Sequence, residues 1–516
     1  MTGTDAERNG TARRMRRLPM AHTTPATTHP VGREEPRAGA VIGALAAAGI
    51  TVAVMQTLVV PLIPDLPALL DTSPSAASWV ITATLLAGAV ATPVTGRLGD
   101  MYGKRRVLLA CLALLVVGSA ICALGDSLVP VLVGRALQGC AMGVIPLGIS
   151  IMRDELPPER MGSAMALMSA SFGIGGALGM PLSAAVAQAT DWHMLFWGSA
   201  GLGAITFVLV TVLVRESPVR GGGRFDVPGA IGLSAGLICL LLAISKGGDW
   251  GWSAPLTLGL FAAAPVILLL WGAYELRART PLVDLRTTAK PRVLLTNLTS
   301  VLVGFSMYAM QLVQPQILQL PAETGYGLGQ SMVAAGLCMA PSGVVMMLVS
   351  PVSARLSARW GPKTSLITGV GGVALGYAVG IPLMSEVWHL VLVSCIIGAG
   401  IAVAYAAMPA LIMSAVPVTE TAAANGLNAL MRSVGISSSS AVAGVLLASM
   451  TTSFAGTEVP SLAGFRTAFA IAGAAALAAI ALALFIPAHR PGRPVAVRPE
   501  PGTAQPRPSG TASTPA

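Results

Sequence analysis

Long apolar runs separated by short polar segments fill most of the chain. A helix that crosses a bilayer needs about 20 predominantly apolar residues, and the pattern predicts fourteen such helices. They are expected at residues 39–63, 76–96, 106–125, 128–151, 162–188, 193–214, 227–246, 254–273, 293–314, 330–351, 364–385, 388–412, 422–449 and 467–487. An even number of crossings places both chain ends on one side of the membrane. The predicted fold class is an all-α integral membrane protein with 14 transmembrane helices.

Two polar turns that lie 258 residues apart share a sequence pattern. The segment PVTGRLGDMYGKR at residues 93–105 aligns without a gap with PVSARLSARWGPK at residues 351–363, and Gly103 matches Gly361. This repeat pairs the second and third helices with the tenth and eleventh. It predicts two six-helix, pseudo-symmetric halves plus two inserted helices. Transporters built from such parallel repeats carry their substrate site between the halves, near the middle of the bilayer.

The repeat and the polar segments divide the chain into five parts. Residues 1–38 and 488–516 are polar and lack a hydrophobic period, so we expect disordered cytoplasmic tails there. The two six-helix halves are expected at residues 39–214 and 293–487. Residues 215–292 are expected to hold the inserted helix pair, helices 7 and 8, with its flanking loops.

Composition and charge agree with a membrane protein and assign its orientation. Hydrophobic residues make up 54% of the chain and charged residues only 10%, far below the soluble average of about 25% charged residues. The tails and one set of alternate loops hold 28 of the 32 Lys and Arg residues. Because Lys and Arg accumulate in cytoplasmic loops, we expect both termini in the cytoplasm and the chain in the cell inner (plasma) membrane. This distribution explains the net charge of +10 without a nucleic-acid partner.

The first copy of the repeated turn, GRLGDMYGKRR, is rich in charge and glycine. Each unpaired charge in lipid costs about 2.5–3.5 kcal/mol even on lenient scales, so the turn is expected at a membrane surface. An aspartate there can pair with an arginine or meet a helix N-terminus. The second copy has Ala358 in its place, which confines that role to the first half. The candidate conformational-switch residues are Gly96, Asp100, Gly103, Lys104 and Arg105.

Two arginines fall inside predicted helices, Arg135 in the fourth and Arg432 in the thirteenth. A guanidinium stays charged, and a charge inside the membrane is a candidate for function. Arg135 lies too deep to reach the outer surface easily, and Gln138, three residues further on, could share its environment. Arg432 fits a cavity cation and a side chain that reaches the cytoplasmic surface equally well. We assign all three residues to a candidate substrate and proton pathway.

Few other polar residues occur in the predicted helices. Tyr308, Gln311 and Gln314 recur at three-residue spacing in the ninth helix, where substrate contact and interhelical hydrogen bonding are both open. None of the 22 Asp and Glu residues falls in the middle of a helix, and Asp65 comes closest, near the outer end of the first. Tyr308, Gln311 and Asp65 complete the candidate pathway. A cavity with arginines and no carboxylate predicts a preference for neutral or anionic amphiphiles over lipophilic cations.

The fifth predicted helix contains a glycine-rich run, GIGGALGMPLSAAV. It lies within an apolar segment and follows no strand, which argues against a dinucleotide-binding loop. Small residues let helices approach closely, and a proline can kink a helix. The candidate packing and bending residues are Gly173, Gly176, Gly179 and Pro181.

Three of these segments resemble signatures of the major facilitator superfamily. GRLGDMYGKRR is similar to its loop signature, LVGRALQG at residues 132–139 resembles its helix 4 signature, and the glycine-rich run resembles the helix 5 signature of its exporters. With fourteen helices, the chain most resembles the 14-helix drug:proton antiporter group. The resemblance implies that Arg135 lies in the central cavity and takes part in proton coupling. It also implies that the bend near Pro181 helps to seal the pathway and to set the direction of transport.

The chain departs from the family pattern at two positions. Met180 separates Gly179 from Pro181, which are adjacent in the usual helix 5 signature. Met55 stands where the 14-helix group carries an aspartate in helix 1. The resemblance therefore leaves the proton carrier open, with Asp65 and Asp100 as candidates.

The predicted function is secondary active efflux of drugs or antibiotics, with amphiphilic small molecules exported by a monomer in exchange for protons through alternating access. An importer of the same fold and a non-transport membrane receptor or scaffold are the alternatives. We expect no enzyme activity, cofactor or metal. The six cysteines are isolated within apolar runs, and the chain lacks both a P-loop and an HExxH motif.

Overall fold

The computed structural model describes residues 35–59, 62, 65–454 and 456–487. In these residues, thirteen helices are long and apolar enough to cross a membrane. The helices that form these spans are α1 (Glu35–Thr57), α4 (Trp79–Tyr102), α5 (Lys104–Leu124), α6 (Leu128–Cys140) followed by α7 (Val144–Glu155), α8 (Pro158–Ala189), α9 (His193–Leu213), α10 (Val227–Trp250), α11 (Pro255–Glu275), α13 (Pro291–Gln319), α14 (Met332–Gly380), α15 (Val387–Met413), α16 (Thr421–Ser449) and α17 (Leu462–Leu484).

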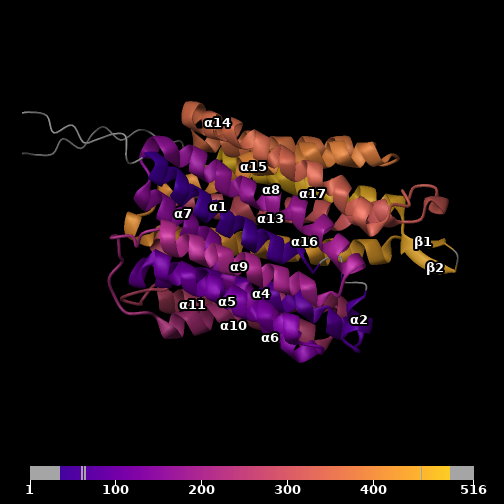
Figure 1. The fold of residues 1–516 in the computed structure, drawn as a ribbon, viewed down its shortest axis with the longest axis horizontal. Coiled ribbons are helices and arrows are strands. Elements are labelled where there is room, and N and C mark those ends of the chain that lie inside the picture. The colour runs from indigo at the N-terminus through magenta and orange to yellow at the C-terminus, as the bar shows by residue number, and fades with distance from the viewer. Residues whose placement is uncertain (1–34, 60–61, 63–64, 455, 488–516) are drawn as a thin grey trace, which may run out of the picture.

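Short elements occupy the connections. They are α2 (Leu66–Leu69), α3 (Pro74–Ala77), α12 (Leu285–Thr288), the 3-10 turns Ala141–Gly143, Ala322–Thr324 and Val418–Glu420, and the antiparallel strands β1 (Thr451–Phe454) and β2 (Thr457–Pro460). The hairpin of β1 and β2 was not expected from the apolar pattern, and it lies at one end of the helical bundle (Figure 1). The segment predicted as the first tail ends earlier than expected, because α1 begins at Glu35. Residues 1–34 and 488–516, where tails were predicted, lie outside the described residues.

The longest helix, α14, consists of two helical arms. Its 49 residues would extend about 73 Å as one straight helix, more than twice the hydrocarbon thickness of a bilayer. Gly361 interrupts it with φ 84° and ψ 160°, values that are not helical. Counting its two arms separately brings the thirteen spans to the predicted fourteen. Gly103, the matching residue of the first copy, separates α4 from α5 with φ 115°. Both predicted copies of the turn therefore break the chain at the same glycine.

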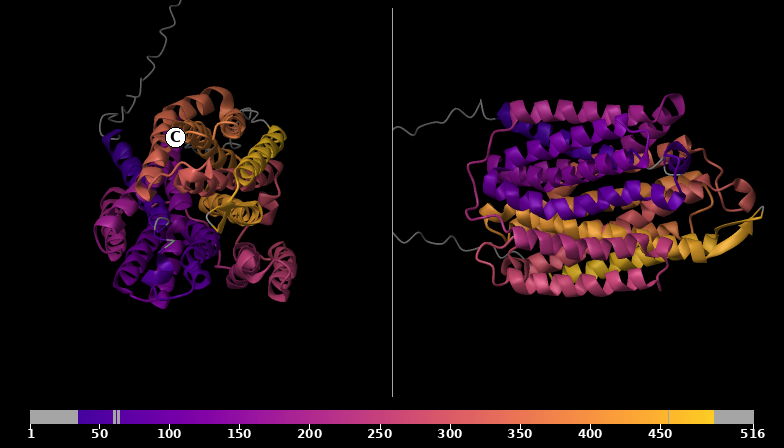
Figure 2. Two further views of the ribbon diagram at one scale, coloured as in Figure 1. Left: turned by 90° about the vertical axis from the view of Figure 1, so that its right-hand side faces the viewer. Right: turned by 90° about the horizontal axis from the view of Figure 1, so that it is seen from below.

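The spanning helices lie side by side along the long axis of the molecule (Figures 1 and 2). One buried apolar cluster is built mainly from α13 to α17, and another mainly from α1, α5, α7 and α8. Many large apolar side chains point outward, among them Val212 and Leu269, which are 75% and 74% exposed. Such a surface suits a lipid environment.

The helices α10 and α11 pack against each other at the edge of the bundle, as the end-on view in Figure 2 shows. Of the two, α10 contacts both α4 and α16. Lys246 of α10 is buried beside α4, where its ammonium group lies 5.0 Å from the ring centroid of Trp79 and bonds to Ser75 O at 3.0 Å. These contacts fix α10 against the start of α4.

Candidate substrate cavity and helix junction

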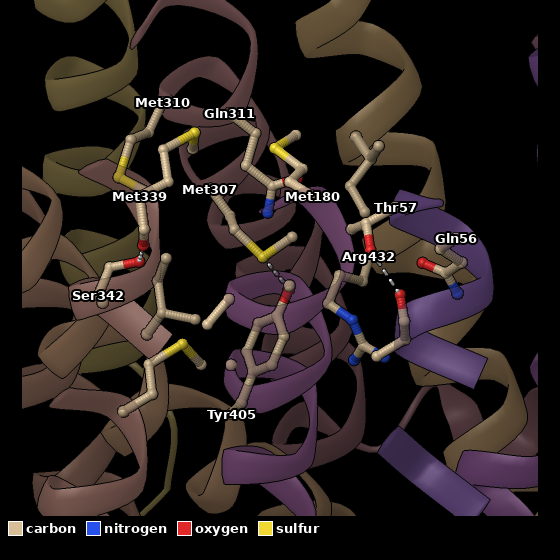
Figure 3. A pocket seen from close by; sticks show the side chains of 18 residues that line it. Gln56, Thr57, Met180, Met307, Met310, Gln311, Met339, Ser342, Tyr405 and Arg432 are labelled. Atoms are coloured by element: carbon tan, nitrogen blue, oxygen red, sulfur yellow. Dashed lines mark hydrogen bonds between the residues drawn. The ribbon is translucent and has the colours of Figure 1, made fainter. Parts of the chain in front are cut away.

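The helices of the two apolar clusters form two sets, one with α13 to α17 and the other with α1, α5, α7 and α8. A cavity of about 130 Å³ lies between these two sets. Six spanning helices supply its walls, namely α1, α8, α13, α14, α15 and α16. The side chains in Figure 3 belong to its eighteen lining residues. These residues are Ala53, Gln56, Thr57, Gly173, Gly176, Ala177, Met180, Met307, Met310, Gln311, Met339, Ser342, Met346, Gly398, Ile401, Tyr405, Arg432 and Ile436.

The cavity wall combines five methionines with one cation. The guanidinium carbon of Arg432 lies 4.8 Å from the ring centroid of Tyr405, within the range of a cation–π contact. The Tyr405 hydroxyl donates to Met307 Sδ at 2.9 Å (Figure 3). Methionine side chains are flexible and polarizable, and they suit surfaces that accept ligands of varied shape. None of the eighteen lining residues is Asp or Glu. The cavity therefore offers a positive group, aromatic and thioether surface, and neutral amides.

Arg135 lies outside this set of lining residues, in a separate buried site. Its side chain is 2% exposed and donates to Gln138 Oε1 at 2.7 Å and to Val80 O at 3.3 Å. It also donates to the carbonyl oxygen of Met55 at 3.4 Å. Met55 is the residue at the position where the family pattern has an aspartate. Gln138 in turn donates to Ser119 Oγ at 2.7 Å. The predicted proximity of Arg135 and Gln138 is confirmed, and all of these acceptors are neutral.

The predicted polar strip on α13 divides between two surroundings. Gln311 lines the cavity, whereas Tyr308 is not among the lining residues. Gln314 is fully buried and donates to Leu390 O of α15 at 2.8 Å. Asp65 is exposed and precedes α2. Of this group, only Gln311 reaches the cavity.

Asp100 joins α4 to the start of α16. Its carboxylate is fully buried and accepts hydrogen bonds from Ala422 N at 3.2 Å and Ala423 N at 2.9 Å. A helix N-terminus carries unpaired N–H groups and a partial positive charge, so a carboxylate is favoured there. The helices also touch closely, since a β-carbon on Gly96 would lie 2.6 Å from Ala422 O. We call this contact between α4 and α16 the junction.

Charged residues of neighbouring segments extend the junction. Lys104 is fully buried between two acids, with its ammonium group 2.6 Å from Asp154 Oδ2 and 3.8 Å from Asp100 Oδ1. Arg153 of α7 donates to Thr421 Oγ1 of α16 at 2.6 Å. These contacts tie helices of both sets together at the Asp100 end of the bundle.

The turn at Gly103 is held from outside the two helices that it connects. Glu216, in the segment after α9, accepts from the N–H groups of Arg105 and Arg106 at 3.2 Å each. A β-carbon on Gly103 would lie 2.7 Å from the Glu216 carboxylate, and its φ of 115° favours glycine. The side chain of Arg105 donates to Thr211 O of α9 at 2.6 Å.

The glycine-rich run of α8 serves mainly for close packing. A β-carbon on Gly173 would lie 2.7 Å from Met346 of α14, and one on Gly179 would collide with Thr57 of α1. Gly176 has no atom within 4 Å of that position and lines the cavity. Pro181 lies against α14, with its N atom 3.4 Å from a β-carbon built on Gly336.

Several residues at the site escaped the sequence analysis. The cavity residues Gln56, Thr57 and Tyr405 are ordinary polar residues of apolar helices, and no motif marks them. Asp154 and Glu216 were counted only as loop charges, although they bond to the predicted turn. The spacing of Met307, Met310 and Gln311 on α13 is a helical i, i+3, i+4 pattern and was the one available signal.

A bundle of spanning helices in two sets, with a cavity between them and an ion-paired junction at one end, defines a secondary transporter. The family model of the Major Facilitator Superfamily matches residues 45–440. The chain belongs to this superfamily. It is a multi-pass membrane transporter and not an enzyme.

Individual proteins similar to the chain include named resistance and export proteins. It is 25% identical over 368 residues to multidrug resistance protein 3 of Bacillus subtilis, an alignment that covers 70% of each chain. It is 28% identical over 464 residues to the tetracenomycin C resistance and export protein of Streptomyces glaucescens, covering 87% of this chain and 84% of that protein. A crystal structure of the human organic anion transporter MFSD10 (TETRAN) matches with a TM-score of 0.62 at 16% identity, covering 86% of this chain and 99% of that one. This structural likeness supports the fold.

Proposed function

We propose that the protein exports amphiphilic small molecules in exchange for protons, and that its substrates are neutral or anionic. The observation that carries the charge preference is the composition of the cavity wall, with Arg432 stacked on Tyr405 and no Asp or Glu among the lining residues. A cationic substrate would meet a positive guanidinium in a wall whose lining residues include no carboxylate. The names of two relatives, a multidrug resistance protein and an antibiotic export protein, support export as the direction.

Alternating access would proceed by opening the junction. Asp100, Gly96 and Arg153 hold α4 and α7 against α16, so access from that end requires these contacts to break. We also propose that this end faces the cytoplasm together with both termini, because most Lys and Arg residues lie in loops on this side.

The roles of Arg135 and Arg432 differ in this proposal. Arg432 contacts substrate in the cavity, whereas Arg135 acts in the proton pathway through its chain of neutral acceptors, Gln138 and Ser119. Removal of the Arg432 charge should therefore change which substrates are carried. Removal of the Arg135 charge should change transport of every substrate.

The test uses inside-out vesicles with an imposed proton gradient and a panel of anionic, neutral and cationic aromatic amphiphiles of similar size. We expect gradient-dependent uptake of the neutral and anionic members. Arg432→Gln should reduce uptake of anions by about 10- to 150-fold, because an interaction with a charged group contributes about 1.5–3 kcal/mol. Uptake of neutral members should change little.

Arg466→Gln is the matched control. It removes the same charge from an exposed position near the start of α17. Cation uptake as strong as anion uptake would contradict the charge preference. The absence of gradient-dependent uptake for the whole panel would contradict proton-coupled export.

A further inference from the structure

Two buried carboxyl groups face each other at the base of the inserted helix pair. Asp226 precedes α10 and is 8% exposed, and Glu275 ends α11 and is 2% exposed. A β-carbon built on Gly229 would collide with Asp226 Oδ2 and lie 2.8 Å from Glu275 Oε2. Both oxygens therefore lie against the same point, which makes the two carboxyl groups neighbours. Oδ2 of Asp226 and Oε2 of Glu275 have no hydrogen-bond partner in the part of the chain that the structure describes.

The remaining oxygen of each carboxyl group is fixed by the surrounding chain. Asp226 Oδ1 accepts from Gly229 N and from the Tyr274 hydroxyl, both at 2.9 Å. Glu275 Oε1 accepts from Val283 N at 2.6 Å. These bonds hold the two unpartnered oxygens toward each other, so neither side chain can turn away without losing a bond.

Two carboxylates this close cannot both stay ionised at little cost when they are buried. In the described residues, no Lys or Arg lies within salt-bridge distance of either group. One proton between Oδ2 and Oε2 would turn the repulsion into a hydrogen bond and satisfy both atoms. We propose that Asp226 and Glu275 share one proton and form a proton-binding site in the inserted helix pair.

Other titratable groups surround the pair without neutralising it. The hydroxyl group of Tyr274 of α11 donates a hydrogen bond to Asp226 Oδ1. Beyond Leu282 and Val283, a separate cavity of about 130 Å³ contains three further charged side chains. They are Arg97 of α4, Asp284 before α12 and Glu420 before α16.

The pair is connected to the junction through the segment that follows α11. Leu282 and Val283 are 1% and 5% exposed and belong to one apolar cluster with Ala89 of α4 and with Leu427 and Leu430 of α16. The bond from Val283 N to Glu275 holds this segment in place. Loss of the shared proton would leave two adjacent negative charges, push the ends of α10 and α11 apart and loosen the segment from α4 and α16.

The first test is infrared spectroscopy of the purified full chain in lipid nanodiscs at neutral pH. The difference spectrum of wild type minus Glu275→Gln should contain the carbonyl stretch of one protonated carboxylic acid. Glu323→Gln is the matched control, because Glu323 is exposed and should contribute only an ionised carboxylate. A difference spectrum for Glu275→Gln that contains only a carboxylate would overturn the proposal.

Gly229→Ala is a second variant that keeps both carboxyl groups and inserts a methyl group beside their facing oxygens. The protonated band should shift or vanish in this variant, and an unchanged band would also overturn the proposal.

In parallel, hydrogen exchange of residues 281–288 is measured as a function of pH and corrected for the intrinsic rate. Protection of these amides from exchange should fall in wild type at the pH where the carboxylic acid band disappears. It should stay constant in Glu275→Gln. Equal pH dependence in both proteins would contradict the link to the segment. These readouts need no substrate, so they stand apart from the test of export.

Discussion

The junction makes a quantitative prediction for Asp100→Asn. The substitution preserves the shape of the side chain and removes the negative charge that meets the first N–H groups of α16. Asp100 accepts from Ala422 N and Ala423 N. A hydrogen bond to a charged group contributes about 1.5–3 kcal/mol, against about 0.5–1.5 kcal/mol for a neutral pair. A difference of about 1 kcal/mol for each bond gives about 2 kcal/mol for the closed junction.

This free energy should appear as faster amide exchange at the start of α16. Amides that exchange through local opening report the free energy of that opening, and about 2 kcal/mol corresponds to about a 30-fold change in the equilibrium. Hydrogen exchange of the full chain in lipid nanodiscs, read on the peptide that contains Ala422 and Ala423, measures it directly. Asp191→Asn is the matched control, because Asp191 also accepts from a backbone N–H, that of His193 at 3.1 Å, but lies in the connection between α8 and α9.

The reasoning has a clear counter-result. If exchange at Ala422 and Ala423 is the same in Asp100→Asn and wild type while the bundle stays folded, the carboxylate does not stabilise the junction. If Asp191→Asn raised the exchange rate at Ala422 and Ala423 by the same factor, the effect would be a general loosening of the bundle.

Three further predictions concern other contacts of the site. Arg135→Gln should lower the midpoint of thermal unfolding, because acceptors left unpaired in a buried site cost about 1–3 kcal/mol each. Lys104→Met should destabilise by about 3–5 kcal/mol, since it removes the ion-pair partner of the buried Asp154, and Lys104→Met combined with Asp154→Leu should recover part of the loss in the same assay. Hydrogen bonds from the backbone and side chain of His193 lower the pKa of Asp191 below its ordinary value of 3.8. The stabilisation from this contact is therefore complete above pH 3.8 and lost as the pH falls through the folded pKa. In His193→Ala, an NMR titration should show the pKa of Asp191 rising but staying below 3.8, because the backbone N–H of residue 193 still donates to the carboxylate.

The spanning helices could be predicted from the sequence because each needs only a long apolar run. The repeated turn was also readable, since Gly103 and Gly361 both adopt positive φ values that favour glycine. The direction in which each face of a helix points could not be predicted from the sequence. Arg135 and Arg432 look alike as charges inside apolar runs, and only the rotation of α6 and α16 against their neighbours places Arg432 at the cavity and Arg135 away from it.

Helix geometry also explains why the predicted strip on α13 divides. A step of three residues falls about 60° short of a full turn, so Gln311 and Gln314 point in different directions. One reaches the cavity and the other the backbone of α15. The carboxyl pair of the inserted helices was equally hidden, because Asp226 and Glu275 stand at the ends of two different apolar runs and read as loop charges.

The position of α10 has a consequence for molecules dissolved in the bilayer. Because α10 contacts both α4 and α16, it covers one of the two seams along which the sets of helices meet. The other seam lies between α8 and α14, where Leu178, Leu337 and Val344 are each at least half exposed to the surroundings. The two seams therefore differ at the lipid boundary: the inserted pair covers one, whereas the other presents apolar side chains directly to the bilayer.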